Sequence, residues 1–304
     1  MTSTVAPPTE PNRIPPRVLL LLIILTLVWG TNWPLFPFAV REVSVWTFRA
    51  VGVSMAGAAL LLVARARGLS LTIPREHWPT VVIATMFYLV LWNITSTYAA
   101  ILIPSGQAAI LGFTMPLWSA LISWAILGER LTGRMLIAVL LGGAGVTLLM
   151  VPSFQAYAQA PLGMALGLIA GLGWAIGTLI LKRSKVAVSA MVLTGWQLLI
   201  CAVPTTIGAF VLGDWKWFMP SWTSIGVITY IALVPMCIGN LCWFSIVGLL
   251  PANVAGLSSI MVPVVAMIAG AFVHGEPLGV LQWLAMLCCV AALSLVLLRP
   301  TRGA

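Results

Sequence analysis

The tripeptide Leu102-Ile103-Pro104 recurs as Leu249-Leu250-Pro251, and Leu127-Gly128-Glu129-Arg130-Leu131 recurs as His274-Gly275-Glu276-Pro277-Leu278. Both pairs are separated by 147 residues, and no gap is needed from about residue 90 to the end of each half. Each half contains five hydrophobic segments. Because five is odd, the second half must enter a membrane from the side opposite to the first. Two inverted halves around a midplane cavity are typical of a transporter that opens alternately to each side.

The composition indicates that the solvent of this chain is lipid. Of its 304 residues, 61% are hydrophobic and only 7% are charged, whereas a soluble domain carries roughly 25% charged residues. The net charge of +9 is compatible with nucleic-acid binding, but the charges lie in short loops between apolar stretches. We therefore interpret them as signals of membrane topology and expect no nucleic-acid partner.

Breaks at Pro, Gly and charged residues divide the chain into ten segments of roughly 20 residues, the length that spans a hydrocarbon core as a helix. The segments are continuously apolar, not alternating, so we predict an all-α integral membrane protein and not a barrel. The predicted spans are 18–39, 44–64, 79–100, 104–127, 133–152, 161–181, 190–212, 222–247, 252–273 and 278–298. They form a first five-helix repeat (18–152) and a second, inverted repeat (161–298), preceded by a disordered cytoplasmic tail (1–17).

The distribution of Lys and Arg predicts the orientation. With the N-terminus in the cytoplasm, only Arg41 and Lys216 lie outside, and Arg49 lies within a helix. The cytoplasmic residues are then Arg13, Arg17, Arg65, Arg67, Arg75, Arg130, Arg134, Lys182, Arg183, Lys185, Arg299 and Arg302. This bias predicts a multi-pass membrane protein with both termini in the cytoplasm.

Matched prolines and asparagines are the strongest local indication of a site. Pro116 and Pro263 occupy the middle of segments 4 and 9 at equivalent repeat positions, and we predict that they act as hinges beside a cavity. The alternative is a kink that only shapes helix packing. Asn93 and Asn240 are the matched polar pair of segments 3 and 8, and each is either a substrate ligand or an interhelical hydrogen-bonding group.

Further candidates for substrate binding are the intramembrane polar residues Gln107, Thr114, Gln197 and Tyr230, each of which could instead be structural. Five tryptophans are expected deep in the membrane: Trp92, Trp118, Trp174, Trp196 and Trp243. An aromatic cavity with a few amides suits an amphipathic organic solute with a sizeable side chain, although core packing is the alternative for any one tryptophan. Glycines recur every four residues at Gly163, Gly167 and Gly171, which predicts close helix packing.

Charged groups in the membrane are sparse. Arg49 could attract a carboxylate, but it could equally bond loop carbonyls, and we favour the structural role. Every Asp, Glu and His lies in a tail, a loop or a segment end, so we predict no metal site, no catalytic residues and no intramembrane proton relay. The chain has no phosphate-binding loop, and we expect no cofactor. The five cysteines lie within predicted spans and have no metal or redox spacing.

Several of these motifs resemble the drug/metabolite transporter superfamily, specifically its EamA-type ten-helix exporters. They are Leu27-Val28-Trp29-Gly30-Thr31-Asn32-Trp33, Phe48-Arg49, Trp174-Ala175, Pro116 with the 127–131 motif, and Pro263 with the 274–278 motif. The resemblance covers nearly the whole chain and implies ten helices, cytoplasmic termini and export of small metabolites. The chain is also similar to YddG-type exporters, which implies aromatic amino acids as substrates. Trp29 and Trp174 join the candidate substrate-binding residues.

These observations favour an exporter of amino acids or related amphipathic metabolites that works by alternating access as a facilitator. We expect it to act as a monomer or weak dimer in the bilayer on a small-molecule substrate. A broad exporter of drugs or quaternary amines is one alternative, although no buried acid is visible for a cation. A membrane scaffold without transport activity is another, which the inverted repeat disfavours.

Overall fold

The computed structural model describes residues 16–103, 105–126, 128, 132–151, 154–184, 186–213, 220–250, 259–275 and 278–297. All regular elements within these residues are helices, which confirms the all-α membrane fold. Seven described helices are long and apolar enough to cross a membrane, and three shorter apolar helices lie at Gly133–Leu148, Val262–Val273 and Val280–Ala292. These elements are consistent with ten spans. The predicted tail, apart from its last residues, and the acidic pair Glu129 and Glu276 lie outside the described residues.

The first repeat is built from helices that often break within one span. Its elements are α1 (Pro16–Gly30), η1 (Trp33–Leu35), α2 (Phe36–Ala39), α3 (Val45–Ala66), η2 (Arg75–His77), α4 (Trp78–Thr85), η3 (Met86–Leu91), α5 (Trp92–Leu102), α6 (Ser105–Gly112), α7 (Met115–Ala125) and α8 (Gly133–Met150). A short helix, α9 (Phe154–Gln159), then leads to the second repeat.

The second repeat follows the same plan. Its elements are α10 (Pro161–Ser184), α11 (Ala190–Val211), α12 (Trp222–Ile231), η5 (Ala232–Gly239), α13 (Asn240–Leu249), η6 (Ser259–Met261), α15 (Val262–His274) and α16 (Val280–Leu297). The bounds of α16 are those of α8 displaced by the 147-residue offset seen in the sequence.

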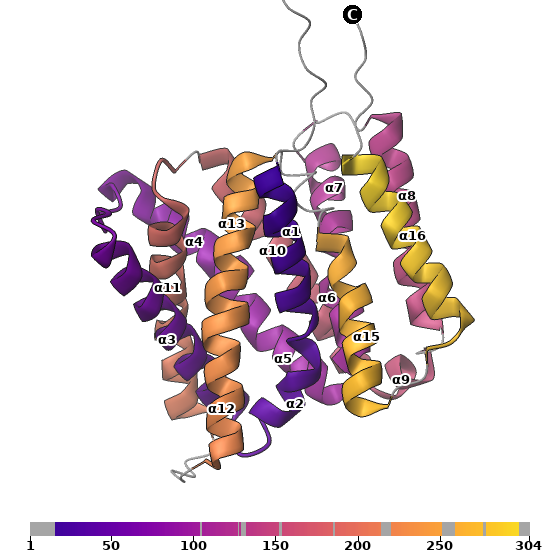
Figure 1. Cartoon of the computed structure of the whole chain (residues 1–304), viewed down its shortest axis with the longest axis horizontal. Coiled ribbons are helices and arrows are strands. Elements are labelled where there is room, and N and C mark those ends of the chain that lie inside the picture. The colour runs from indigo at the N-terminus through magenta and orange to yellow at the C-terminus, as the bar shows by residue number, and fades with distance from the viewer. Residues whose placement is uncertain are drawn as a thin grey trace, which may run out of the picture.

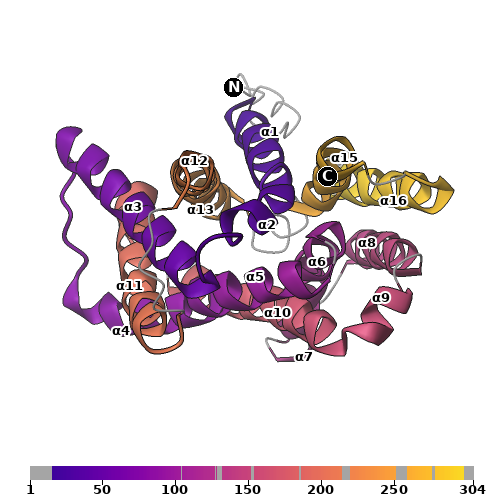
Figure 2. The same ribbon diagram turned by 90° about the horizontal axis from the view of Figure 1, so that it is seen from below.

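Equivalent helices of the two repeats pack against each other. The α3 helix packs along α11, and α8 packs along α16. Figure 1 shows that α8 descends to α9 whereas α16 rises from α15, so these equivalent helices run in opposite directions. The start of α1 and the end of α16 lie at the same end of the bundle. Seen from below, α8 and α16 form one side of the molecule and α3 and α11 the other (Figure 2).

Two π-helical turns occupy equivalent positions in spans 3 and 8. The η3 segment (Met86–Leu91) lies between α4 and α5, and η5 (Ala232–Gly239) lies between α12 and α13. A π-turn adds a residue to the helical repeat and leaves a carbonyl without its usual i+4 partner, and such turns occur frequently at functional sites. The sequence analysis did not predict these segments.

The prolines of spans 4 and 9 lie at helix starts, not in the middle of kinked helices. Pro116 is in the first turn of α7, after a break at Phe113 and Thr114 that separates it from α6. Pro263 is likewise in the first turn of α15, directly after η6. Proline is well tolerated there because the first-turn N–H groups have no intrahelical acceptor. Span 4 is therefore a discontinuous helix, and span 9 changes from a 3-10 turn to an α-helix just before Pro263.

The glycine stripe of α10 forms a close helix contact, as predicted. A Cβ atom at Gly167 would lie 2.7 Å from the Cβ of Leu111 on α6. At Gly177 it would lie 2.6 Å from the Cβ of Tyr88 and 2.7 Å from the Ala84 carbonyl oxygen. Only a hydrogen atom fits in these gaps, so the glycines fix α10 against spans 3 and 4.

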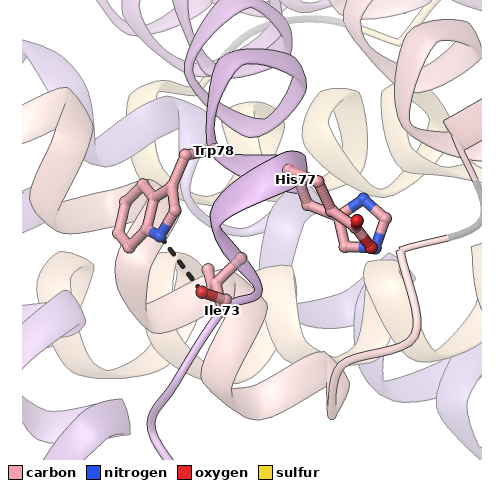
Figure 3. A network of polar contacts seen from close by, with 4 residues as sticks. Ile73, His77 and Trp78 are labelled. Atoms are coloured by element: carbon pink, nitrogen blue, oxygen red, sulfur yellow. Dashed lines mark hydrogen bonds and ion pairs between the residues drawn. The ribbon is translucent and has the colours of Figure 1, made fainter.

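The loop between α3 and α4 is anchored by tryptophans. The indole Nε1 of Trp78 donates to the Ile73 carbonyl at 3.2 Å, and His77 contacts Glu76 at 3.6 Å (Figure 3). Trp196 donates to the Leu71 carbonyl at 2.7 Å and stacks edge-on with Trp78. Trp196 was expected deep in the membrane, but it lies in the second turn of α11, where its indole binds the backbone of this loop.

Candidate functional site

One cavity lies where the first four spans meet spans 6 and 8. Its free volume is about 40 Å³, well below the roughly 300–1,000 Å³ of typical ligand pockets, so the cavity must widen to admit a ligand of that size. Its walls are aromatic, with a few amides and one guanidinium. The lining residues are Trp29, Asn32, Trp33, Phe36, Arg49, Leu89, Trp92, Asn93, Phe113, Trp174, Pro235, Met236 and Asn240.

Equivalent residues in and just after the two π-helical turns belong to this lining. Asn93 donates from Nδ2 to the Leu89 carbonyl at 2.8 Å, and Asn240 donates from Nδ2 to the Met236 carbonyl at 2.7 Å. Each asparagine thus satisfies the carbonyl four residues earlier, which matters in a helix whose backbone ladder is disturbed. The two repeats therefore share the same asparagine-to-carbonyl hydrogen bond at equivalent positions, and not only the same residue type.

Trp29 connects the two repeats at the cavity. Its indole Nε1 donates to the carbonyl of Pro235 in η5 at 3.1 Å, across 206 residues of sequence. Its ring centroid lies 5.3 Å from that of Trp174, which in turn lies 4.8 Å from that of Trp92. Trp243 contacts both Trp29 and Trp174 from behind the cavity wall. These tilted and edge-on contacts are the favoured geometry for aromatic pairs.

Arg49 is the charged residue of the cavity wall. It is 2% exposed, and its Nε donates to the Thr97 hydroxyl at 2.6 Å. The guanidinium carbon lies 4.6 Å from the ring centroid of Phe36 and 4.7 Å from that of Phe48. Thr97 in turn donates to the Asn93 carbonyl at 2.6 Å, so α3 and α5 are joined by a chain of hydrogen bonds beside the cavity.

Four of the predicted substrate-binding residues line this cavity, namely Trp29, Asn93, Trp174 and Asn240. The other four are not part of its lining. Thr114 directly precedes α7, donates to the Leu111 carbonyl at 2.6 Å and accepts a hydrogen bond from Trp118 at 3.1 Å. Gln197 is fully buried on α11, Gln107 is half-buried on α6, and Tyr230 is 38% exposed on α12. Their substrate roles stay predictions.

Sequence reasoning did not single out several residues of the wall. Asn32, Trp33 and Phe36 follow α1, where the chain turns through η1, and Phe113 lies in the break between α6 and α7. Irregular backbone at membrane depth is tolerated where it lines a cavity, so Gly30-Thr31-Asn32 and the proline Pro34 were available signals. Among the described residues, no group of three or more His, Cys, Asp or Glu side chains is close enough together to hold a metal ion.

Polar contacts tie helix termini together at opposite ends of the bundle. At the end where α12 begins, Glu42 accepts from the Ser221 amide at 2.8 Å and from its hydroxyl at 2.9 Å. The Ser224 hydroxyl, followed by the amide and hydroxyl of Ser221, lowers the pKa of the Glu42 carboxyl below its usual value. At the other end, Lys182 donates from Nζ to the carbonyls of Val247 and Leu250 at 2.6 and 2.8 Å.

The inverted repeats, the paired π-helical turns and the cavity between them define a membrane transporter. Comparison with known proteins agrees, because residues 16–151 and 161–298 each match the EamA-like transporter family. The chain belongs to this family, within the drug/metabolite transporter superfamily. Such membership implies a small-molecule substrate and a lipid environment.

Named relatives are bacterial transporters. The chain is 26% identical to the "Uncharacterized transporter YvbV" of Bacillus subtilis, over 92% of this chain and 91% of that protein. It is 27% identical to the "Probable amino-acid metabolite efflux pump" of Escherichia coli, over 60% and 63% of the two chains. A solved crystal structure aligns over 94% of this chain and 99% of its own, with a TM-score of 0.75 at 20% identity, which supports the fold alone.

Proposed function

We propose that the protein exports amino acids with aromatic or large neutral side chains, or related small metabolites, across the bacterial inner membrane. Alternating access would carry the substrate through the cavity between the repeats. The observation that carries this proposal is the pair of equivalent π-helical turns in the wall of an aromatic cavity, joined across the repeats by Trp29 and Pro235. The similarity to an E. coli protein named as a probable amino-acid metabolite efflux pump supports this substrate class.

The walls of the cavity suit an amphipathic solute. Trp29, Trp92 and Trp174 offer flat apolar surfaces for a side chain, and the amides of Asn32 and Asn240 offer polar contacts. A small number of polar groups in a mainly apolar pocket fixes the orientation of a ligand. The aromatic walls could also hold a cation, but the wall carries a guanidinium, which would repel a quaternary amine.

Transport would run down the gradient of the substrate itself. In the sequence, all six acidic residues lie in tails or loops. The two within the described residues, Glu42 and Glu76, are placed at helix ends and take part in contacts outside the cavity. A proton-coupled carrier usually needs a titrating group within the membrane path.

Counterflow in liposomes tests the proposal. Purified protein is reconstituted with a saturating internal concentration of unlabelled phenylalanine, leucine or tetraethylammonium, and uptake of the labelled compound is followed. We expect exchange of the amino acids with no imposed pH difference or membrane potential, and no uphill accumulation when a pH gradient is applied. Intact cells that overproduce the protein should retain less labelled phenylalanine than control cells.

Two matched variants test whether substrate exchange depends on the cavity wall. Trp174→Ala removes a ring from the wall, and we expect it to abolish most exchange, whereas Trp222→Ala removes a ring that is 87% exposed and should leave exchange unchanged. Exchange of tetraethylammonium without exchange of amino acids would instead establish the quaternary-amine exporter. Uphill accumulation driven by the pH gradient would reject the facilitator mechanism.

A further inference from the structure

Arg49 is a buried cation with unused hydrogen-bonding capacity at the substrate cavity. A guanidinium offers five N–H donors and stays protonated in proteins. Its Nε donates to the Thr97 hydroxyl, whereas its Nη2 is buried and has no hydrogen-bond partner among the described residues. The rings of Phe36 and Phe48 contact the guanidinium but provide no lone pair. The local structure therefore holds Arg49 in place without completing its hydrogen bonds.

No acidic side chain among the described residues compensates this charge. Glu42 lies between α2 and α3 and binds Ser221, and Glu76 lies in η2 and is 77% exposed beside His77. A charge removed from water is costly unless it is paired and hydrogen-bonded. An anionic group that enters the cavity would supply the missing partner, and a carboxylate fits the planar fork of a guanidinium.

Three other lining residues of this cavity also carry buried polar atoms with no hydrogen-bond partner among the described residues. Within the described parts of the chain, the indole Nε1 of Trp174 is a buried donor without an acceptor, and the Oδ1 atoms of Asn32 and Asn240 are buried acceptors without a donor. The orientation of the Asn240 amide is fixed because its Nδ2 donates to the Met236 carbonyl, which leaves the oxygen toward other partners. Unused donors, unused acceptors and aromatic surfaces thus line one cavity.

We propose that Arg49 binds the carboxylate of the transported molecule, with the Asn240 and Asn32 oxygens receiving its ammonium group and the tryptophans its side chain. The substrate class is then a zwitterionic α-amino acid with an aromatic or large apolar side chain, and a carboxylate is required for binding. This assignment rests on the proposed function and deepens it. It also replaces the purely structural role that the sequence favoured for Arg49.

Calorimetry on the full-length protein in nanodiscs tests the assignment with four probes: L-phenylalanine, its methyl ester, 2-phenylethylamine and 3-phenylpropionate. The methyl ester and the amine lack the carboxylate, and phenylpropionate lacks the ammonium. We expect phenylalanine to bind at least about ten-fold more tightly than the ester or the amine, since a hydrogen bond to a charged group contributes this much. Phenylpropionate should retain more affinity than phenylethylamine. This comparison needs no variant, so it does not depend on whether a variant folds.

Variants then assign the discrimination to Arg49. Arg49→Gln should lower the affinity for phenylalanine to that for phenylethylamine, and Arg49→Lys, which keeps the charge but not the fork, should recover it in part. The matched control is Arg65→Gln, which removes the same charge from an exposed position on the same helix and should bind like the wild type. Equal binding of phenylalanine and phenylethylamine by the wild type, or full discrimination by Arg49→Gln, would overturn the assignment.

The flux assay separates this inference from the proposed function. Discrimination that depends on Arg49, without counterflow in liposomes, supports the binding assignment and rejects export. Counterflow of phenylethylamine as fast as phenylalanine, undiminished in Arg49→Gln, supports transport and rejects a carboxylate requirement. Failure of every probe to bind the wild type rejects the assignment, and counterflow of tetraethylammonium then decides between the remaining exporters.

Discussion

Trp29 shows at the scale of one residue how the two repeats are joined. Its ring packs so closely on η5 that a Cβ atom at Gly239 would lie 2.3 Å from the indole Nε1. The same Nε1 donates to the Pro235 carbonyl, which belongs to the disturbed backbone of a π-helical turn. One side chain thus forms part of the cavity wall and satisfies a backbone group of the other repeat. In lipid, no water can replace that hydrogen bond.

We expect Trp29→Phe to be destabilising although position 29 stays aromatic. The change keeps an aromatic surface but leaves the Pro235 carbonyl without its donor, which costs roughly 1–3 kcal/mol for a buried acceptor. Thermal unfolding of the purified protein in detergent, followed by circular dichroism, measures the loss. Trp222→Phe is the control, because Trp222 is 87% exposed. Equal midpoints for both variants would mean that the indole hydrogen bond contributes nothing.

At the scale of elements, each repeat places irregular backbone in the same two spans. Spans 3 and 8 contain π-helical turns, span 4 is broken before Pro116, and span 9 has a 3-10 turn directly before Pro263. Irregular helical segments have fewer regular backbone hydrogen bonds to break when they bend. We propose that the segments at Pro116 and Pro263 act as hinges during alternation.

Replacing the prolines tests the hinge. Pro116→Ala supplies an N–H that can bond the Gly112 carbonyl four residues earlier, which would join α6 and α7 into one helix. We expect initial transport rates to fall by roughly ten-fold, which corresponds to a barrier higher by about 1.4 kcal/mol, with little change in unfolding temperature. Pro263→Ala should act in the same way.

A proline elsewhere provides the control for this prediction. Pro204 lies inside the continuous helix α11, so Pro204→Ala removes a helix-disfavouring residue without closing a break. We expect its transport rate to stay close to that of the wild type. Unchanged rates in Pro116→Ala, Pro263→Ala and the double variant would reduce both prolines to packing residues.

The whole molecule is held at both ends by contacts to helix termini. Glu42 binds the start of α12, and its lowered pKa means that this contact is complete above the ordinary carboxyl pKa of 4.5 and is lost only as the pH falls through the lower folded value. Lys182 binds the last carbonyls of α13 at the opposite end. Since α12 and α13 belong to one span with a π-helical turn between them, its two ends are anchored while its centre lines the cavity.

Impermeant thiol labelling of intact cells tests the orientation of the molecule. In a background without the five native cysteines, Arg41→Cys should react from outside, and Arg67→Cys should be protected until the membrane is permeabilised. Both residues are exposed and the substitution is the same, so each is the matched control of the other. The reverse pattern would place both termini outside and reject the positive-inside assignment.

The sequence by itself determined the membrane class, the inverted repeat, the pairing of Asn93 with Asn240 and the equivalence of Pro116 and Pro263. These properties can be recognised from the sequence because hydropathy, the repeat offset and helix-breaking residues are local features of the chain. Tertiary structure alone decided which side chains share the cavity, because that depends on which faces of helices distant in sequence meet. Packing therefore brought Asn32, Phe36 and Arg49 into the wall and left Gln197 and Tyr230 outside it. The π-helical turns also lay beyond the sequence, since their irregular ladder is stabilised by tertiary partners such as the Trp29 indole.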